Sequence, residues 1–148
     1  MASKTKMIGT IGEQVLVTEF VKNNIPVLLP VGDNLPYDMI IEISGKFVKI
    51  QVKTTERIKD GKMIFSTNMS NPYKKSSRKY TEKEIDMFGL HCLENGYIGL
   101  LPFGDCTAKE TVIRLESPKN NQMQNIKMAD DYAFCKMVKE LLIKIDKL

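Results

Sequence analysis

The sequence of 148 residues has no tryptophan, one histidine and three cysteines, and each scarcity excludes a class of protein. Cys92, Cys106 and Cys135 are odd in number and far apart, so they fit neither a disulfide framework nor a zinc ribbon. A Ser–His or Cys–His catalytic pair would have to use His91, whose neighbour is Cys92. Neighbouring strand residues point to opposite faces, which argues against such a pair. We therefore expect a structural His91 and buried, unpaired thiols.

Long apolar runs are also absent, because no stretch approaches the ~20 residues that span a bilayer. The N-terminal residues 1–7 lead into a predicted helix and not into an apolar signal segment. The chain is 43% hydrophobic, and its net charge of +4 permits an anionic partner without requiring one. We expect one domain over residues 1–148 in the cytoplasm near the nucleoid, with no membrane partner.

The most informative segment is residues 36–53, which reads as one β-hairpin with a two-residue turn at Ser44-Gly45. In this register Asp38 faces Gln51, and side chains alternate between the two faces. A shift of one residue would set Asp38 opposite Val52 and mix the faces. One predicted face is apolar and consists of Met39, Ile41, Ile43, Val48, Ile50 and Val52. The other carries Asp38, Ile40, Glu42, Phe47, Lys49, Gln51 and Lys53.

The second face gathers a carboxylate, an amide oxygen and an ammonium in Asp38, Gln51 and Lys53. Hydrolysis of a phosphodiester needs ligands for a metal that activates water, and it needs a cation near the developing charge. An ordinary strand with one solvated face shows the same alternation, so the pattern alone also permits a purely structural role. The order of elements favours the catalytic interpretation, since a predicted helix opens at residues 9–14 before the hairpin.

In that order, these residues resemble the PD-(D/E)XK nuclease superfamily and, in detail, its small group I intron-encoded homing endonucleases. The resemblance implies an α/β fold with a restriction-endonuclease-like core, in which a mixed β-sheet is flanked by helices. It implies catalytic roles for Asp38, Gln51 and Lys53, with Glu13 as an auxiliary acid from the first helix. Asp38, Gln51 and Glu13 would bind Mg²⁺, with Mn²⁺ as a substitute. For Glu13 alone, a solvated glutamate in the first turn of the helix is the alternative.

Two positions depart from the superfamily pattern. Pro36 precedes Asp38 by two positions, and Gln51 stands where the superfamily most often has Asp or Glu. An amide offers an oxygen without charge, which predicts weaker metal binding and one firmly held Mg²⁺ rather than two. A Holliday-junction-resolvase-like nuclease is the alternative within the enzymes. A catalytically silent DNA-binding module of the same fold is the alternative outside them.

Basic residues cluster after the hairpin, in a polar segment bracketed by Tyr73 and Tyr80. Such cations bind duplex phosphates, although a charged segment is also typical of a solvated loop. A nuclease that cuts both strands with one site per chain needs at least a dimer, so we expect a homo-oligomer, either dimer or tetramer. The residues predicted to contact double-stranded DNA are Lys49, Arg57, Lys74, Lys75, Arg78 and Lys79.

The rest of the chain is predicted from periodicity and turn residues. We expect a helix over 7–22, strands over 27–30, 87–92, 97–101 and 111–115, and a C-terminal helix whose apolar stripe runs from Phe134 to Ile145. The turn Asp60-Gly61 would join strands 54–58 and 63–67 into an antiparallel meander with the hairpin. Residues 68–79 would be a loop, and Thr81-Glu82-Lys83-Glu84 has the capping-box form of a short helix.

Overall fold

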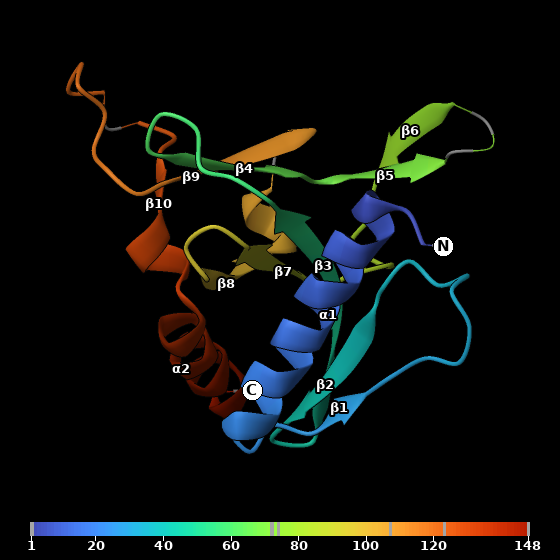
Figure 1. Cartoon of the computed structure of the whole chain (residues 1–148). Helices are drawn as coiled ribbons and strands as arrows, with labels where there is room; N and C mark the ends of the chain where they lie inside the picture. The colour runs from blue at the N-terminus through green and yellow to red at the C-terminus, as the bar shows by residue number, and fades with distance from the viewer. Residues whose placement is uncertain (1, 72, 74, 107, 123, 148) are drawn as a thin grey trace.

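The structure is a computed structural model that describes residues 2–71, 73, 75–106, 108–122 and 124–147. Its order of elements is shown in Figure 1. The elements are α1 (Lys4–Lys22), β1 (Val27–Leu28), β2 (Met39–Ile43), β3 (Lys46–Thr55), β4 (Lys62–Ser66), β5 (Asn68–Asn71), β6 (Ser76–Lys79), β7 (Met87–Cys92), β8 (Ile98–Pro102), η1 (Phe103–Asp105), β9 (Glu110–Arg114), β10 (Lys127–Met128), η2 (Ala129–Tyr132) and α2 (Phe134–Asp146).

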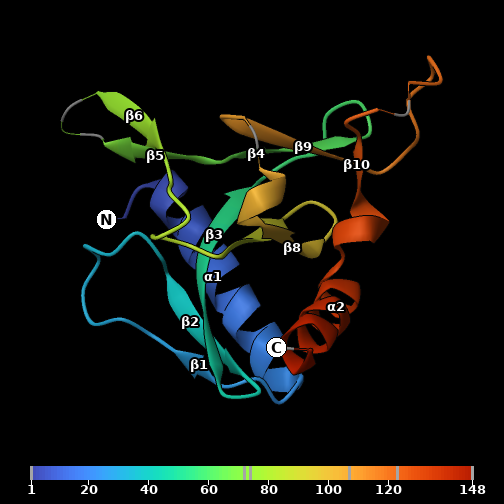
Figure 2. The same ribbon diagram turned by 180° about the vertical axis from the view of Figure 1, so that it is seen from behind.

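A five-stranded sheet in the order β1-β2-β3-β7-β8 forms the centre of the molecule. Its β3–β7 pair is parallel and its other pairs are antiparallel, so the sheet is mixed. Both helices pack against the same face of this sheet, with α1 crossing the middle strands (Figures 1 and 2) and the Phe134 ring of α2 in contact with the Phe20 ring of α1. The predicted mixed sheet with flanking helices is therefore confirmed.

The buried strand β7 separates two apolar clusters, because neighbouring residues of a strand face opposite sides of the sheet. Met87 packs with Leu16 and Phe20 of α1, whereas Phe88 packs with Phe65 of β4 on the other side. Every residue of β7 is buried, as expected for a strand covered on both faces. Among the described residues, no helix is long and apolar enough to cross a membrane.

The β2–β3 hairpin forms in the predicted register, with Met39 opposite Ile50 and Ile43 opposite Lys46. Ser44 and Gly45 have φ values of 49° and 75°, and positive φ at both central residues is the signature of a type I′ hairpin turn. All six residues of the predicted apolar face are buried. A two-residue turn and a strict apolar alternation therefore suffice to define this element.

The predicted meander is wrong. The Asp60-Gly61 turn forms, with φ values of 49° and 69°, but β4 pairs with β9 in a separate three-stranded sheet, β10-β9-β4. The edge of β3 that the meander would have used is occupied by β7. A distant buried strand therefore replaces the local partner, and sequence periodicity carries no signal for such a choice.

Two further predictions are wrong in the segment between β4 and β7. Residues 68–79 are not a loop, because β5 and β6 form a two-stranded antiparallel ribbon. The predicted short helix is only a turn, although the Thr81 N–H does donate to the Glu84 carboxylate at 2.9 Å. After this turn, the Asp86 carboxylate accepts the Lys49 N–H at 2.8 Å and so ties the chain to β3. Strand β7 begins at the next residue.

The remaining elements match the sequence with shifts of a few residues. Helix α1 starts at Lys4 because the Ser3 side chain caps it by accepting the Lys6 N–H. His91 is structural as predicted, since it is buried and its Nδ1 lies 2.9 Å from the Tyr97 carbonyl oxygen. All three cysteines are free, but only Cys92 is buried and Cys135 is exposed, which corrects the expectation of buried thiols.

Candidate active site

Asp38 is positioned by the backbone at the entrance of β2. Its N–H donates to the Ile50 carbonyl oxygen at 2.9 Å, and its carboxylate Oδ2 accepts the Val52 N–H at 2.8 Å. The side chain is half-buried, and this desolvation raises the pKa of the Asp38 carboxyl. The Val52 N–H and the nearby Lys53 charge act in the opposite direction. One carboxylate oxygen is thus held in place on the hairpin.

Glu13 reaches the same site from α1. Glu13 and Asp38 line one cavity of about 230 Å³ beside the loop that precedes β2. Burial and the charge of Asp38 both raise the pKa of the Glu13 carboxyl, so the two carboxylates repel each other. The structure therefore brings together an acid from the first helix and the hairpin aspartate.

A glycine makes the approach of α1 possible. A Cβ atom added at Gly12 would lie 1.9 Å from the Thr54 Oγ1 of β3, a separation that real atoms do not adopt. At Gly9, one turn earlier, an added Cβ would meet nothing within 4 Å. Gly12 therefore sets how closely the helix lies on β3, and with it the position of the adjacent Glu13 side chain.

Lys53 lies near Asp38, and its ammonium is held by two groups. Its Nζ donates to the Asn68 carbonyl oxygen at 2.9 Å and stands 5.0 Å from the centre of the Tyr80 ring. Burial lowers the pKa of Lys53, and the Asp38 charge opposes that shift. Tyr80 is itself buried, and desolvation is the main reason that its pKa rises to about 12. The ring and the carbonyl oxygen restrain the ammonium group.

Gln51 lies on β3 between Lys49 and Lys53, and strand alternation places all three on one face. Its side chain is half-buried and makes no hydrogen bond to any other residue within the described ranges. The amide oxygen is therefore available as a ligand.

This donor set fits a hard divalent cation of modest affinity. The described residues contain no group of three or more His, Cys, Asp or Glu side chains that could hold a metal. The site instead offers two carboxylates, Glu13 and Asp38, and the neutral amide of Gln51. Burial disfavours the charged form of both carboxylates, the Asp38 charge adds to this at Glu13, and a bound cation would relieve both effects. Oxygen ligands of this kind suit Mg²⁺.

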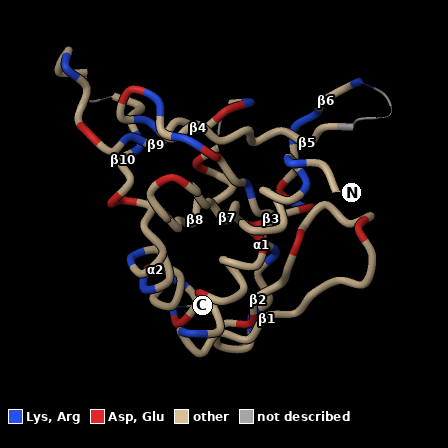
Figure 3. Tube along the Cα trace, viewed as in Figure 1, with Lys and Arg blue, Asp and Glu red and all other residues tan. Residues whose placement is uncertain are grey.

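The residues predicted to contact DNA are placed in different ways. The Lys49 ammonium donates to the Lys83 carbonyl oxygen, and Arg57 is exposed beyond the end of β3. The Arg78 guanidinium forms two hydrogen bonds with the Glu84 carboxylate, at 2.6 and 3.0 Å. Lys75 and Lys79 are exposed on the β5–β6 ribbon, whereas Lys74 lies outside the described residues. Figure 3 shows the basic residues along this ribbon.

Three residues of the site were missed from sequence. Gly12 had a signal, because a glycine inside a helical apolar pattern often marks close packing. Tyr80 borders a basic segment of the sequence, which does not mark it as a site residue, and no sequence pattern marks Asn68. The Asn68 side chain is buried, and its Oδ1 is left without a hydrogen-bond partner in the part of the chain that the structure describes.

Comparisons with known proteins concern the family and the fold of the chain. The family model described as PD-(D/E)XK endonuclease matches residues 3–135. Among solved structures, the chain is similar to a bacterial homing endonuclease, I-Ssp6803I, with 21% identity, a TM-score of 0.77, and coverage of 98% of this chain and 97% of that one. It is also similar, with 15% identity and a TM-score of 0.45 over 72% of this chain and 83% of that one, to a Holliday junction resolvase from Archaeoglobus fulgidus. No curated protein sequence matches the chain.

Proposed function

We propose that this chain, which belongs to the PD-(D/E)XK endonuclease family, is a Mg²⁺-dependent enzyme that cleaves double-stranded DNA at specific sequences. The observation that carries the proposal is the convergence of α1 and the β2–β3 hairpin, where Glu13 and Asp38 line one cavity next to the restrained Lys53 ammonium. The homing endonuclease subtype is supported by the fold shared over nearly the whole of both chains.

Asp38, Glu13 and Gln51 would hold the metal, since they are the carboxylate and amide oxygen donors of the site. When bound, Mg²⁺ supplies a Lewis acid for the scissile phosphate and lowers the pKa of the attacking water. The Val52 N–H keeps the Asp38 carboxylate oriented before DNA arrives. Preorganised ligands of this kind need no rearrangement during the reaction.

Lys53 would stabilise the negative charge that develops on the phosphoryl oxygens. Its ammonium is held by the Asn68 carbonyl oxygen and the Tyr80 ring, so it loses little conformational freedom when substrate binds. One of its three N–H groups is engaged with Asn68, which leaves N–H donors for the phosphate or for the attacking water.

Cleavage of both strands of a duplex would use more than one chain. The chain contributes one such site, and the two strands of DNA run in opposite directions, which suits a two-fold symmetric assembly. We therefore include a homo-oligomer, a dimer or a tetramer, in the proposed function. Duplex DNA would be held by cations near the site, among them Lys75 and Lys79 of the ribbon.

The silent DNA-binding module is the second candidate, and Gln51 is the observation that favours it. A site with two carboxylates and an amide carries less negative charge than one with three carboxylates, so it attracts a divalent cation less strongly. Cleavage in the presence of metal separates this candidate from the enzyme.

The test is cleavage of supercoiled plasmid, of a randomised linear duplex library and of a four-way junction in Mg²⁺ or Mn²⁺. Asp38→Ala and Lys53→Ala should each reduce cleavage by at least about 100-fold. Asp60→Asn, in the turn before β4, and Lys46→Ala, at the first residue of β3, are matched controls outside the site, and they should cut like the wild type. Binding without cleavage in either metal would support the silent module, and preference for the junction would support a resolvase.

A further inference from the structure

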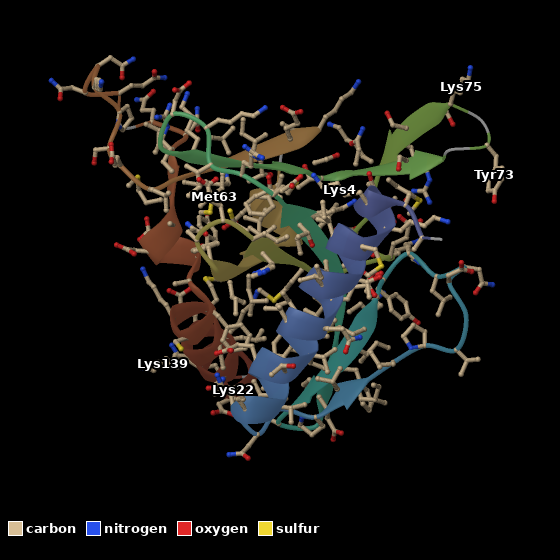
Figure 4. All side chains as sticks on the ribbon, viewed as in Figure 1. Lys4, Lys22, Met63, Tyr73, Lys75 and Lys139 are labelled. Atoms are coloured by element: carbon tan, nitrogen blue, oxygen red, sulfur yellow. The ribbon has the colours of Figure 1, made fainter. Side chains whose placement is uncertain are left out.

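The β5–β6 ribbon belongs to neither of the larger sheets. It projects from the body of the molecule beside the start of α1, as both ribbon views show (Figures 1 and 2). Its tip carries Tyr73 and Lys75, both exposed, and the Lys75 side chain points away from the body (Figure 4). The tip of such a short, projecting and basic ribbon does not help to form the hydrophobic core.

The register of the ribbon sorts its side chains into two faces. Asn68 pairs with Lys79, Met69 with Arg78, Ser70 with Ser77 and Asn71 with Ser76, and paired residues point to the same side. One face therefore carries Met69, Ser76 and Arg78. The other carries Ser70, Ser77 and Lys79, with Asn68 at its base, and we call Ser70, Ser77 and Lys79 the open face.

The face opposite to the open face is attached to the body. Met69 packs against the apolar cluster that contains Tyr80 and Phe88, and the Arg78 guanidinium is paired with the Glu84 carboxylate. The three residues of the open face are all exposed. Within the described ranges, the Lys79 ammonium has no ion pair. The open face is therefore the one that a ligand could reach.

The ribbon starts at the active site, because the Asn68 carbonyl oxygen accepts the Lys53 ammonium at 2.9 Å. From Asn68 to Asn71, three steps of about 3.3 Å carry the chain roughly 10 Å outward. This distance equals about three base pairs of DNA at a rise of 3.4 Å each. A duplex with its scissile phosphate at Lys53 would place the nearby base pairs beside the ribbon.

We propose that the ribbon enters the major groove of DNA, and that Ser70, Ser77 and Lys79 read base edges roughly two to four base pairs from the cut. The inference rests on the proposed function and names the part of the protein that recognises its substrate. The major groove, about 12 Å wide, admits a two-stranded ribbon, whereas the minor groove, about 6 Å wide, does not. Serine hydroxyls can donate or accept at base edges, and a lysine ammonium donates to guanine O6 and N7.

Arg78 has a different role in this arrangement. Its guanidinium is engaged with Glu84, so it is a positioning residue that fixes the angle of the ribbon relative to the turn at 81–84. The same turn is tied to β3 through the Lys49 ammonium and the Lys83 carbonyl oxygen. The turn at 81–84 therefore connects the ribbon to the active-site strand β3 through these hydrogen bonds.

The test uses a library of randomised duplexes and sequences two fractions, the DNA bound without metal and the DNA cut in Mg²⁺. Ser70→Ala/Ser77→Ala and Lys79→Ala should each reduce base discrimination by about 5-fold or more at one or more positions. Ser76→Ala is the matched control, because Ser76 is an exposed neighbour of Ser77 on the opposite face. It should keep the wild-type preference at every position.

The two fractions separate the outcomes. Preferences that change in the bound fraction support the ribbon even if no DNA is cut, in which case the proposed endonuclease function fails by itself. Unchanged preferences in the open-face variants overturn the ribbon even if the wild type cuts specifically. Failure to enrich any duplex in the bound fraction also overturns it.

A separate measurement addresses Arg78. If Arg78 positions the ribbon, Glu84→Gln should weaken duplex binding as much as Arg78→Ala, and the double variant should be no weaker than either. The slope of log affinity against log salt should then stay unchanged. If Arg78 instead contacts a phosphate, Arg78→Ala alone should reduce that slope by about 1, which would overturn the positioning role.

Discussion

On the inner face of the β2–β3 hairpin, Met39, Ile41 and Ile50 have no exposed surface, whereas on the outer face Asp38 and Lys53 are ionisable groups that are only half-buried. Burial of the inner residues removes apolar surface from water and stabilises the fold. Burial of the outer residues shifts the pKa of each against its charged form and costs stability. One hairpin thus combines the centre of the core with a site that is kept at some cost to folding.

This difference between the two faces distinguishes the residues of a strand that stabilise the fold from those that serve the reaction. The inner residues could be exchanged for other apolar side chains of similar volume at small cost. For Asp38 and Lys53 burial outweighs the favourable contacts of their charges, so their chemical identity has to be explained by what they bind.

Substitutions of neighbouring residues on the two faces should differ most in their effect on the stability of the protein. Ile50→Ala leaves a cavity between α1 and the sheet and should lower the free energy of unfolding by about 2–5 kcal/mol. Gln51→Ala, one position later on the outer face, should change it by less than about 0.5 kcal/mol while weakening metal-dependent cleavage. Urea denaturation with both variants measures the difference, and equal destabilisation would contradict the assignment of the faces.

Gly12 is the point at which the two faces are coupled, because it touches Thr54 on the inner face and precedes Glu13 at the site. Gly12→Ala should destabilise the fold by about 1–3 kcal/mol and displace Glu13. A shift of about 1 Å at a catalytic group can reduce turnover by as much as ~100-fold.

Gly9→Ala is the matched control for this change, since an added methyl group there meets nothing. Replacement of glycine by alanine in an open helical position should stabilise the protein by about 0.5–1 kcal/mol. Thermal unfolding and initial cleavage rates of the two variants provide the comparison. A Gly12→Ala protein with wild-type rates would show that α1 does not set the position of Glu13.

Removal of the Asp38 charge should separate stability from activity. Asp38→Asn keeps an oxygen for the Val52 N–H but removes a charge that is disfavoured by burial and that also disfavours the charged form of Glu13. We expect the metal-free variant to be more stable by on the order of 1 kcal/mol and to lose cleavage. Mg²⁺ should raise the melting temperature of the wild type and not that of the variant.

The smallest effect should be the change of the free energy of unfolding with pH, measured in EDTA. The pKa of both Asp38 and Glu13 is raised in the folded state, so the folded protein binds more protons than the unfolded one between the ordinary and the raised values. Their stabilising contribution is therefore complete below the ordinary carboxylate pKa and is lost as pH rises through the raised values. Glu13→Gln/Asp38→Asn should flatten this part of the profile, and an unchanged profile would contradict the shifts.

Most of the candidate site could be predicted from sequence because it depends on one local element. Asp38, Gln51 and Lys53 share a face for reasons of strand alternation and turn geometry, both of which act over a few residues. Glu13 could be named only through family resemblance, since its place at the site depends on how α1 packs. Asn68 escaped prediction because its contact with Lys53 is made by a backbone carbonyl oxygen, which every residue has.

The β2–β3 hairpin, with its register and faces, could be predicted from sequence, as could the two helices and the strands β7 and β8. Each follows from turn residues and apolar periodicity within one segment. Only the tertiary structure decided that β7 pairs with β3, that β4 joins β9, and that a ribbon stands at residues 68–79. Strand pairing satisfies backbone N–H and C=O groups that are the same in every residue. The choice between partners therefore depends on how the whole core packs and is not recorded in any single stretch of the chain.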